Sequence, residues 1–413
     1  MRRRDFLGWS ALGGALCITV GKNAWAALAE VPTSGPASRL VIVFLRGAVD
    51  GLSVVVPYAE SAYYKMRDTI AIPPPGRDGG GLDLDGYFAL HPALATLMPY
   101  WHSGQMAFVH AAGSNDPTRS HFDAQDYMES GTPGRKSTTD GWVNRMLGVL
   151  PGSGTAVNVG AVMPRALAGS QPVAVLPSGR AATRSSPLDR PRISDAFDQL
   201  YGGNDKLSDA YRESRQSHKD MMATLAAENI ENEMQAANNG ATLPNVFAED
   251  AGRLARIMRG DPRMRIAFLA VGGWDTHANQ GSSRGQLANR LQPLGNGLAA
   301  LAQGLGPAWA DTVIVVMSEF GRTAKQNGNR GTDHGHGNVM WLLGGTVAGG
   351  RVHGRWPGLD SSALYEGRDL AVTTDFRDVL ATIATRHLRI PEQQLATVFP
   401  SFKSEGPLRL LRS

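Results

Sequence analysis

The sequence predicts an α/β fold in which a doubly wound, mostly parallel sheet is covered by helices on both faces. Continuous apolar runs, such as residues 39–45 and 312–316, are typical of parallel strands that are buried on both faces. Stretches with helical spacing of apolar residues alternate with these runs, which favours a parallel sheet with crossover helices. A length of 413 residues suits one large domain with an insertion.

The expected elements can be placed along the chain. Buried strands are predicted at 39–45, 105–110, 171–176, 265–271, 311–317 and 339–343, and helices at 61–67, 92–103 and 376–387. Thr374 or Asp375 is the expected cap of the last helix. Residues from about 193 to 260 are polar and rich in Ala, Glu, Asn and Met, so they predict a mostly helical insertion.

The N-terminus has the features of a targeting segment. Arg3-Arg4-Asp5-Phe6-Leu7 fits Arg-Arg-x-Phe-Leu and resembles the twin-arginine export signal, and a weakly apolar stretch follows it. Cleavage is expected after Ala26 or Ala29, so residues 1–29 form the signal peptide and 30–413 the mature domain. The apolar stretch is shorter than the roughly 20 residues that span a membrane, so we expect export to the periplasm or beyond, without stable membrane insertion after cleavage.

Charge and cysteine content limit the classes of function. Without residues 1–29 the chain holds 37 basic and 36 acidic residues, so the composition gives no argument for binding nucleic acid. The one cysteine, Cys17, lies within the expected signal peptide. A metal ion in the mature chain would therefore be held by histidine, carboxylate, hydroxyl or backbone groups.

Chemically useful side chains gather on loops that follow predicted strands. Four such loops carry Asp50, Ser120 with His121, Asp275 with His277, and Glu319 with Arg322. A fifth loop, Asp333-His334-Gly335-His336, precedes the strand at 339–343. Because ligands in open α/β sheets bind outside the carboxyl ends of strands, these loops predict a site for one or two divalent ions, of zinc, manganese, iron or calcium. The expected ligands are Asp50, Asp275, His277, Glu319, His334 and His336.

Each of these residues also has a structural interpretation. Asp275 could cap a turn while His277 binds a backbone carbonyl, and Asp50 could close an Asp-Gly turn. His334 and His336 could be exposed on a glycine-rich turn. For Ser120, the spacing to Asp123 is a helix N-cap signature.

The alternative role for Ser120 is catalytic. A hydroxyl at a helix N-terminus, beside Arg119 and a metal ion, is well placed to accept a phosphoryl or sulfuryl group. Arg322 could clamp the non-bridging oxygens of such a group, or it could form a structural ion pair.

The order of the motifs resembles the DUF1501 family of exported bacterial proteins. Besides the twin-arginine start, the matching segments are residues 44–52 (FLRGAVDGL), 120–125 (SHFDAQ), 140–145 (DGWVNR), 273–277 (GWDTH), 318–323 (SEFGRT), 331–335 (GTDHG) and 375–377 (DFR). The resemblance covers nearly the whole mature chain. It implies a distant branch of the alkaline phosphatase and sulfatase superfamily, whose fold is a doubly wound sheet with a two-metal site.

The same resemblance implies roles for particular residues. By position, Asp50 resembles the early metal acid and Ser120 the nucleophile. Asp275 and His277 resemble the Asp–His pair, with one intervening residue instead of three. Glu319 stands where an Asp-His pair is usual, with Phe in place of the histidine, and His334 or His336 stands for the late histidine.

Two hypotheses for function follow. The first is an exported metal-dependent hydrolase of phosphate or sulfate esters, with a hydroxyl nucleophile or a metal-bound water and with Arg119 and Arg322 stabilising the developing charge. The alternative is a catalytically degenerate relative that binds a polysaccharide, a metal ion or a partner protein in the cell envelope. The expected partners are an anionic ester substrate or an envelope polysaccharide, and the twin-arginine export machinery.

Overall fold

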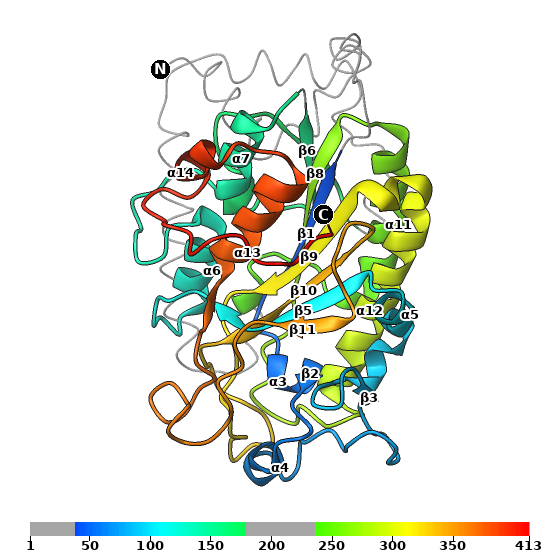
Figure 1. Cartoon of the computed structure of the whole chain (residues 1–413), viewed down its shortest axis with the longest axis vertical. Coiled ribbons are helices and arrows are strands. Elements are labelled where there is room, and N and C mark those ends of the chain that lie inside the picture. The colour runs from blue at the N-terminus through cyan, green and yellow to red at the C-terminus, as the bar shows by residue number, and fades with distance from the viewer. Residues whose placement is uncertain (1–37, 153, 179–235, 413) are drawn as a thin grey trace, which may run out of the picture.

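The computed structural model describes residues 38–152, 154–178 and 236–412 (Figure 1). The expected signal peptide and residues 193–235 of the expected insertion lie outside this part of the chain. Among the described residues, no helix is both long enough and apolar enough to cross a membrane.

A mixed, mostly parallel sheet forms the centre of the described structure. Its nine strands follow the order β11-β5-β10-β9-β1-β8-β6-β7, and β12 pairs with β5. The strands are β1 (Arg39–Leu45), β5 (Met106–Gly113), β6 (Thr155–Val159), β7 (Val173–Leu176), β8 (Met264–Val271), β9 (Thr312–Ser318), β10 (Asn338–Gly344), β11 (Arg351–His353) and β12 (Thr374–Asp375). The predicted α/β fold class is therefore confirmed.

The direction of β10 decides where the functional loops meet. β10 pairs antiparallel with both β5 and β9, whereas β1 pairs parallel with β8 and β9. The start of β10 therefore lies at the same sheet edge as the ends of β1, β5, β8 and β9. For this reason the loop before β10, which holds His334, reaches the edge where the other four loops end.

Helices cover both faces of the sheet. Alternate side chains of β1 pack against the helices of one face and of the other. Val41, Val43 and Leu45 point into the core that contains α11 (Phe247–Gly260) and α12 (Gln286–Leu305). The intervening residues Leu40, Ile42 and Phe44 point into the opposite core, because side chains alternate along a strand.

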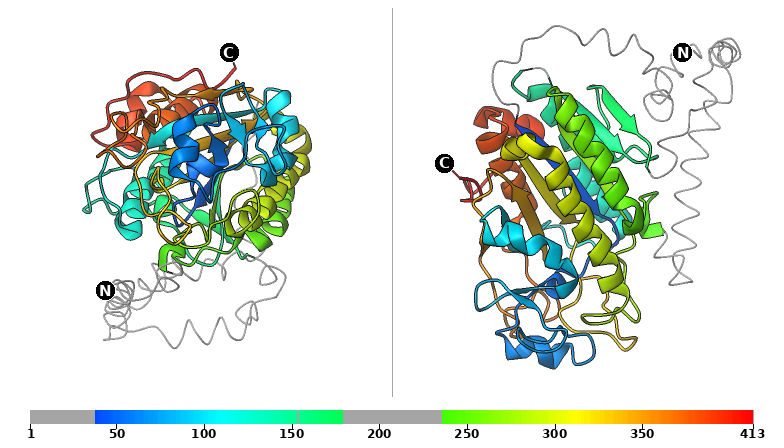
Figure 2. Two further views of the ribbon diagram at one scale, coloured as in Figure 1. Left: turned by 90° about the horizontal axis from the view of Figure 1, so that it is seen from below. Right: turned by 90° about the vertical axis from the view of Figure 1, so that its right-hand side faces the viewer.

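The helices of that second face are α7 (Trp142–Val149), α13 (Phe376–Thr382) and α14 (Leu395–Val398). Figure 1 shows them on the opposite side of the sheet from α11 and α12, and Figure 2 shows α11 and α12 lying across their own face. Two hydrophobic layers, one on each face, therefore hold the sheet edge rigidly.

Further elements flank the sheet. They are α3 (Gly51–Val54), α4 (Ser61–Met66), α6 (His121–Ser130), a small sheet of β2 (Val55–Val56), β4 (Ala89–Leu90) and β3 (Leu82–Asp83), and the 3-10 helix Pro92–Leu97 with α5 (Met98–His102). The helix predicted over 92–103 is thus two pieces. The strand β6 and the helix α12 are additions to the elements expected from the sequence. The helix predicted over 376–387 consists of α13 and a π-helical turn at Ile383–His387.

Candidate metal centre

Three histidines from three different segments, His121 at the start of α6 and His277 and His334 on loops, meet at the carboxyl edge of the sheet. Nε2 of His121 lies 2.9 Å from Nε2 of His334, and Nε2 of His277 lies 2.9 Å from the same atom. Asp275 completes the group, because its Oδ1 lies 3.0 Å from Nε2 of His277 and 3.5 Å from Nε2 of His334. Its Oδ2 lies 3.5 Å from Nε2 of His121.

The other nitrogen of each ring faces an oxygen acceptor outside this group. Nδ1 of His121 lies 2.7 Å from Oε1 of Glu319, and Nδ1 of His277 lies 3.2 Å from Oδ1 of Asp333. Nδ1 of His334 lies 2.8 Å from the backbone oxygen of Arg119. These acceptors favour a proton on each Nδ1, which turns the Nε2 lone pairs toward one another. Carboxylates and carbonyls behind imidazoles orient metal-bound histidines in the same manner.

Asp275 is buried and only partly satisfied by the protein. It has no solvent exposure, and Arg322 donates to its Oδ1. Oδ2 of Asp275, in contrast, accepts no hydrogen bond from the described residues, although it is buried. Burial raises the pKa of Asp275, but Arg322 and the three rings outweigh burial and hold this pKa far below its usual range. The carboxylate is therefore ionised and has a lone pair available for a cation.

The rings differ in their affinity for protons. Burial lowers the pKa of His121, but the Asp275 and Glu319 carboxylates outweigh burial and raise it to about 8. Burial also lowers the pKa of His277, and Asp275 again raises it overall. For His334, burial and the positive charges nearby prevail and lower the pKa to about 4. His334 is thus neutral at neutral pH, while a metal ion would compete with protons on the other two rings.

The chemistry of this donor set fits a divalent ion. Ligand atoms bound at about 2.1 Å lie roughly 3.0 to 3.4 Å from one another. The pairs His121–His334, His277–His334 and His277–Asp275, at 2.9 to 3.0 Å, and the pair His334–Asp275, at 3.5 Å, are close to this spacing. His121, Asp275 and His334 each offer one atom, and these atoms lie within 4.8 Å of one another. Three imidazoles and one carboxylate suit zinc, manganese or iron better than calcium, which prefers oxygen ligands.

Glycines allow the loops to pack backbone against backbone. A Cβ on Gly331 would lie 2.4 Å from the carbonyl carbon of His277, and a Cβ on Gly335 would lie 2.4 Å from that of Arg322. No side chain fits at either position. The two glycines therefore let the His334 loop pack against the loop of Asp275 and His277 and against the loop of Arg322.

Glu319 and Arg322, both predicted site residues, support the group from behind. The Glu319 carboxylate accepts from Gly47 N and Gln125 Nε2 and faces Nδ1 of His121, so it orients that ring instead of meeting the other ligands. Arg322 has a fully buried side chain and donates to Asp275 and to the backbone oxygens of Ala48, Gly47 and Thr332. It positions Asp275 and joins the loops, and its burial leaves it no access to a substrate.

The structure places Asp50 apart from the histidines. Both Asp50 and Arg67 are fully buried, and Arg67 donates to Oδ2 at 2.6 Å and to Oδ1 at 3.0 Å. Ser53 and Gln280 donate to the same carboxylate. Burial raises the pKa of Asp50, but Arg67 outweighs it, so the net shift is downward. The acid that was expected to bind metal instead forms a buried ion pair.

Ser120, Arg119 and His336 also lie outside the group of ligands. Ser120 is exposed and caps α6, with its Oγ accepting from Asp123 N at 3.5 Å. The Arg119 guanidinium pairs with Glu366 and Asp369. The His336 ring stacks on Tyr365 with ring centroids 4.4 Å apart.

Two residues of the site are absent from the set of ligands expected from the sequence. His121 is among the polar residues on the strand-end loops but not among the expected ligands, because it directly follows the cap of the Ser-x-x-Asp signature and Ser120 is the stronger local signal. Gln280 lies fully buried between loops, and its Oε1 accepts from Thr276 and Thr332, which are neighbours of the ligands. No local motif marks such a glutamine, because its partners are distant in sequence.

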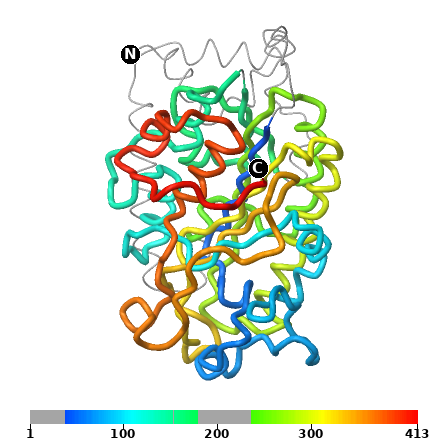
Figure 3. The backbone as a smooth tube through the Cα atoms, in the orientation of Figure 1, coloured from blue at the N-terminus to red at the C-terminus, as the bar shows by residue number. Residues whose placement is uncertain are grey.

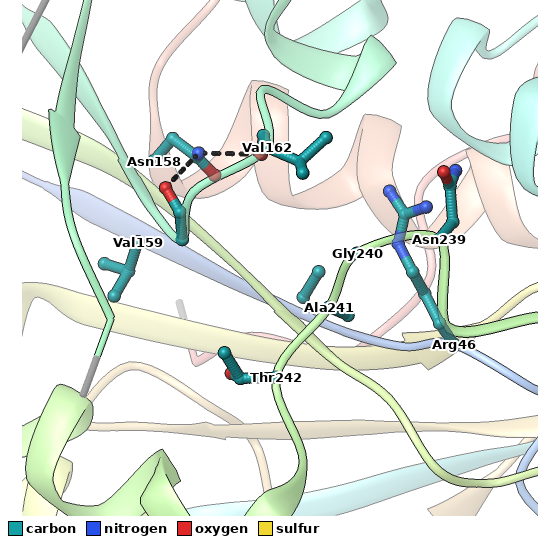
Figure 4. Close-up of a pocket in the computed structure, with 10 residues that line it drawn as sticks. Arg46, Asn158, Val159, Val162, Asn239, Gly240, Ala241 and Thr242 are labelled. Atoms are coloured by element: carbon teal, nitrogen blue, oxygen red, sulfur yellow. Dashed lines mark hydrogen bonds between the residues drawn. The ribbon is translucent and has the colours of Figure 1, made fainter. Parts of the chain in front are cut away.

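A small hollow near Arg46 is separate from the histidines. It is lined by Asn158, Gly160 and residues 239–242, and the Asn158 amide donates to the oxygens of Gly160 and Val162 (Figure 4). Its volume of about 10 Å³ suits a single water molecule.

Comparison with known proteins yields a family match. The family model DUF1501, described as "Protein of unknown function", matches residues 37–399. A search of the curated proteins finds no match.

Solved structures resemble this chain only remotely. The C-terminal periplasmic domain of EcEptC from Escherichia coli is 12% identical, with 92% of this chain and 90% of that chain covered and a TM-score of 0.38. The PsFucS1 sulfatase from Pseudoalteromonas sp. is 11% identical, with 92% and 72% covered and a TM-score of 0.36. The phosphonate monoester hydrolase of Agrobacterium radiobacter is 11% identical, with 90% and 79% covered and a TM-score of 0.36.

Proposed function

For this chain, which belongs to the DUF1501 family, we propose the function of an exported metal-dependent hydrolase of phosphate or sulfate esters. The observation that carries the proposal is the convergence of three imidazole Nε2 atoms on a buried, ionised Asp275. Export rests on the N-terminal motif of the sequence and not on the geometry of the site.

The protein's own groups define the proposed centre. His121, His277, His334 and Asp275 would hold one divalent ion, and Glu319, Asp333 and the Arg119 carbonyl would fix the rings. A bound divalent ion lowers the pKa of a water molecule and polarises an ester oxygen. Arg322 keeps Asp275 ionised and in place, so the carboxylate is preorganised.

The arrangement favours water over Ser120 as the nucleophile. Ser120 is exposed and its Oγ faces the first turn of its own helix, whereas the four proposed ligands are largely buried. A hydrolase of this kind needs no covalent intermediate on the chain. Substrates with an accessible terminal phosphate, phosphonate or sulfate group would suit a site at the edge of a sheet.

One observation favours the second candidate, a degenerate relative that binds a metal ion or a glycan without hydrolysis. Asp50 forms a buried ion pair with Arg67 and is not among the proposed ligands. The proposed centre therefore has ligands for one metal ion, whereas a two-metal hydrolase needs two sets of ligands. The hydrolase and the metal-binding form of the second candidate predict the same metal content and differ in turnover.

The first experiment is elemental analysis of the purified chain, followed by assays with aryl phosphate, phosphonate and sulfate esters. We expect about one equivalent of zinc, manganese or iron in the wild type and in a His102→Ala control, and strongly reduced metal in His334→Ala. His102 is an exposed histidine on α5, so it matches the chemistry of the change without touching the group.

The outcomes separate the candidates. Turnover that needs the metal and disappears in His334→Ala supports the hydrolase. Metal without turnover of any ester supports the binding protein. If the wild type binds no metal even after reconstitution, both versions of the metal site are wrong. Export is tested separately, by comparing periplasmic levels of the wild type and an Arg3→Lys/Arg4→Lys variant.

A further inference from the structure

A groove lined by arginines lies at the sheet edge opposite the candidate metal centre. Its volume is about 690 Å³, and its walls include Arg351, Arg386, Arg409, Arg412, Leu408 and Leu411. Arg351 begins β11, which pairs in parallel with the first residues of β5. The groove therefore lies at the amino ends of the parallel strands, whereas the histidines lie at their carboxyl ends.

The C-terminal segment builds one wall of this groove and is tied to the sheet. Ala348 N donates to Leu410 O at 2.9 Å, and Arg412 N donates to Thr346 O at 2.8 Å. The Arg412 guanidinium also donates to the backbone oxygen of Gly104, at 2.6 Å. Figure 3 shows this segment in red as it returns to the middle of the molecule. The wall is thus a fixed part of the fold.

The groove carries uncompensated positive charge. Arg351, Arg386 and Arg409 are exposed, and within the described ranges none of them forms an ion pair or a side-chain hydrogen bond. No aspartate or glutamate is among the residues that line the groove. Since acidic and basic residues nearly balance in residues 30–413, these arginines are a local concentration of charge.

We propose that this groove binds an anionic glycan that carries sulfate or phosphate groups. Guanidinium groups recognise the oxygens of such groups through paired N–H donors. A volume of about 690 Å³ is far larger than a free oxyanion and lies within the range of pockets for ligands of several rings. Leu408, Leu411 and the backbone at residues 348–349 provide apolar surface between the arginines for the sugar rings.

The lining distinguishes a glycan from other polyanions. It contains no aromatic side chain, so single-stranded nucleic acid would find no surface for base stacking. The groove contains no exposed large hydrophobic residue, because Leu408 and Leu411 are half-buried and Val162 and Leu243 lie elsewhere, so it has no side chain that would insert into an anionic membrane.

The test measures binding of the full chain to a heparin-derived hexasaccharide, with inorganic sulfate, inorganic phosphate and phosphatidylglycerol vesicles as parallel probes. The groove variant is Arg351→Gln/Arg386→Gln/Arg409→Gln. The matched control is Arg77→Gln/Arg256→Gln/Arg284→Gln, which removes the same charge from exposed arginines elsewhere. Metal content and ester turnover are recorded for every variant.

We expect the groove variant to bind the hexasaccharide about tenfold or more weakly, with a smaller dependence on salt, and the control to bind as the wild type does. Metal content and turnover of a small ester should stay unchanged in both variants, so failure here is distinct from failure of the proposed hydrolase. Equal weakening in both variants, no binding by the wild type, binding of free sulfate or phosphate alone, or a preference for vesicles would each overturn the proposal.

Discussion

Nε2 of His121 lies 2.9 Å from Nε2 of His334, although both rings use Nδ1 to reach an oxygen on the opposite side. Two imidazoles arranged in this way present lone pairs to each other unless a cation or a proton lies between them. The carboxylate of Asp275 beside them adds negative charge to the same space. The fold therefore builds an arrangement that a metal ion would stabilise.

Changing Glu319 tests whether the carboxylate behind His121 supports metal binding. We expect Glu319→Gln to lower metal affinity by about 10- to 100-fold, because the ring loses a charged acceptor at Nδ1. Competition with a chelator measures this change. Glu129→Gln is the matched control. Glu129 is a buried carboxylate on α6, the helix that begins with His121, and it pairs with Arg46 and contacts no ligand ring. An equal loss of affinity in both variants would contradict a specific role for Glu319.

Ser120→Ala separates a helix cap from a nucleophile. The Asp123 N to Ser120 Oγ distance of 3.5 Å is long for a cap, so we expect a loss of only about 0.5 to 1 kcal/mol in the free energy of unfolding. Metal content and any metal-dependent ester turnover should stay within about threefold of the wild type. Urea unfolding and steady-state kinetics measure the two effects. A loss of turnover by about a thousandfold with metal retained would show that Ser120 is the nucleophile after all.

Asp50→Asn tests whether the Asp50–Arg67 pair is structural. Removing one partner of a buried pair leaves the Arg67 charge uncompensated, so we expect a loss of about 3 to 5 kcal/mol in the free energy of unfolding. The metal content per folded molecule should stay unchanged. Urea unfolding and elemental analysis of the folded fraction measure these two quantities. The double variant Asp50→Asn/Arg67→Met should recover part of the stability, and loss of metal from folded Asp50→Asn would restore Asp50 as a ligand.

His110 should make the stability depend on pH. It is buried, its Nε2 donates to Val55 O, and its Nδ1 accepts from Ala111 N, so the neutral ring is favoured. Burial lowers its pKa to about 4. In the unfolded chain the ring takes up a proton below about pH 6.5, and the folded chain does so only near pH 4. Stability therefore falls as the pH drops through this window, by about 3 kcal/mol from this residue.

The check is urea unfolding of the wild type and His110→Gln at several pH values between about 7 and 4. The variant should lose part of the pH slope, while His102→Gln, a change at an exposed histidine, should leave it unaltered. His91 is buried with its pKa likewise lowered to about 4, so some slope should persist in His110→Gln. An identical slope in the wild type and His110→Gln would show that His110 titrates normally.

Much of the fold could be predicted because its signals are local. The apolar run at Arg39–Leu45 matches β1 at both ends, and the patterns at 265–271 and 311–317 fall within one residue of β8 and β9. The helical pieces at 92–103 were less well predicted, because apolar spacing does not show where the chain changes from a 3-10 helix to an α-helix.

The candidate site was predicted only in part, for a physical reason. Asp275, His277 and His334 carry their own signal, namely histidines and a carboxylate on loops at strand ends, and the structure brings them together. The partner of Asp50 carries no such signal, because Arg67 is 17 residues away at the end of α4 and nothing local marks it as the partner of a distant acid. Glu319 and Arg322 lie at the candidate site, as predicted. Whether they bind the metal ion or hold its ligands depends on the directions of their side chains, which the sequence does not show.

The sequence by itself determined the α/β class, the strands and the sheet edge at which the polar loops collect, since apolar periodicity and strand-end chemistry are properties of short segments. Only the tertiary structure decided that β10 runs antiparallel, which places His334 at that edge. It also decided that Arg67 pairs with Asp50 and Arg322 with Asp275, and that four arginines lie together at the opposite edge. A buried charge must be paired, and its partner can come from a segment distant in the sequence. Which segments lie next to each other depends on the packing of the whole chain.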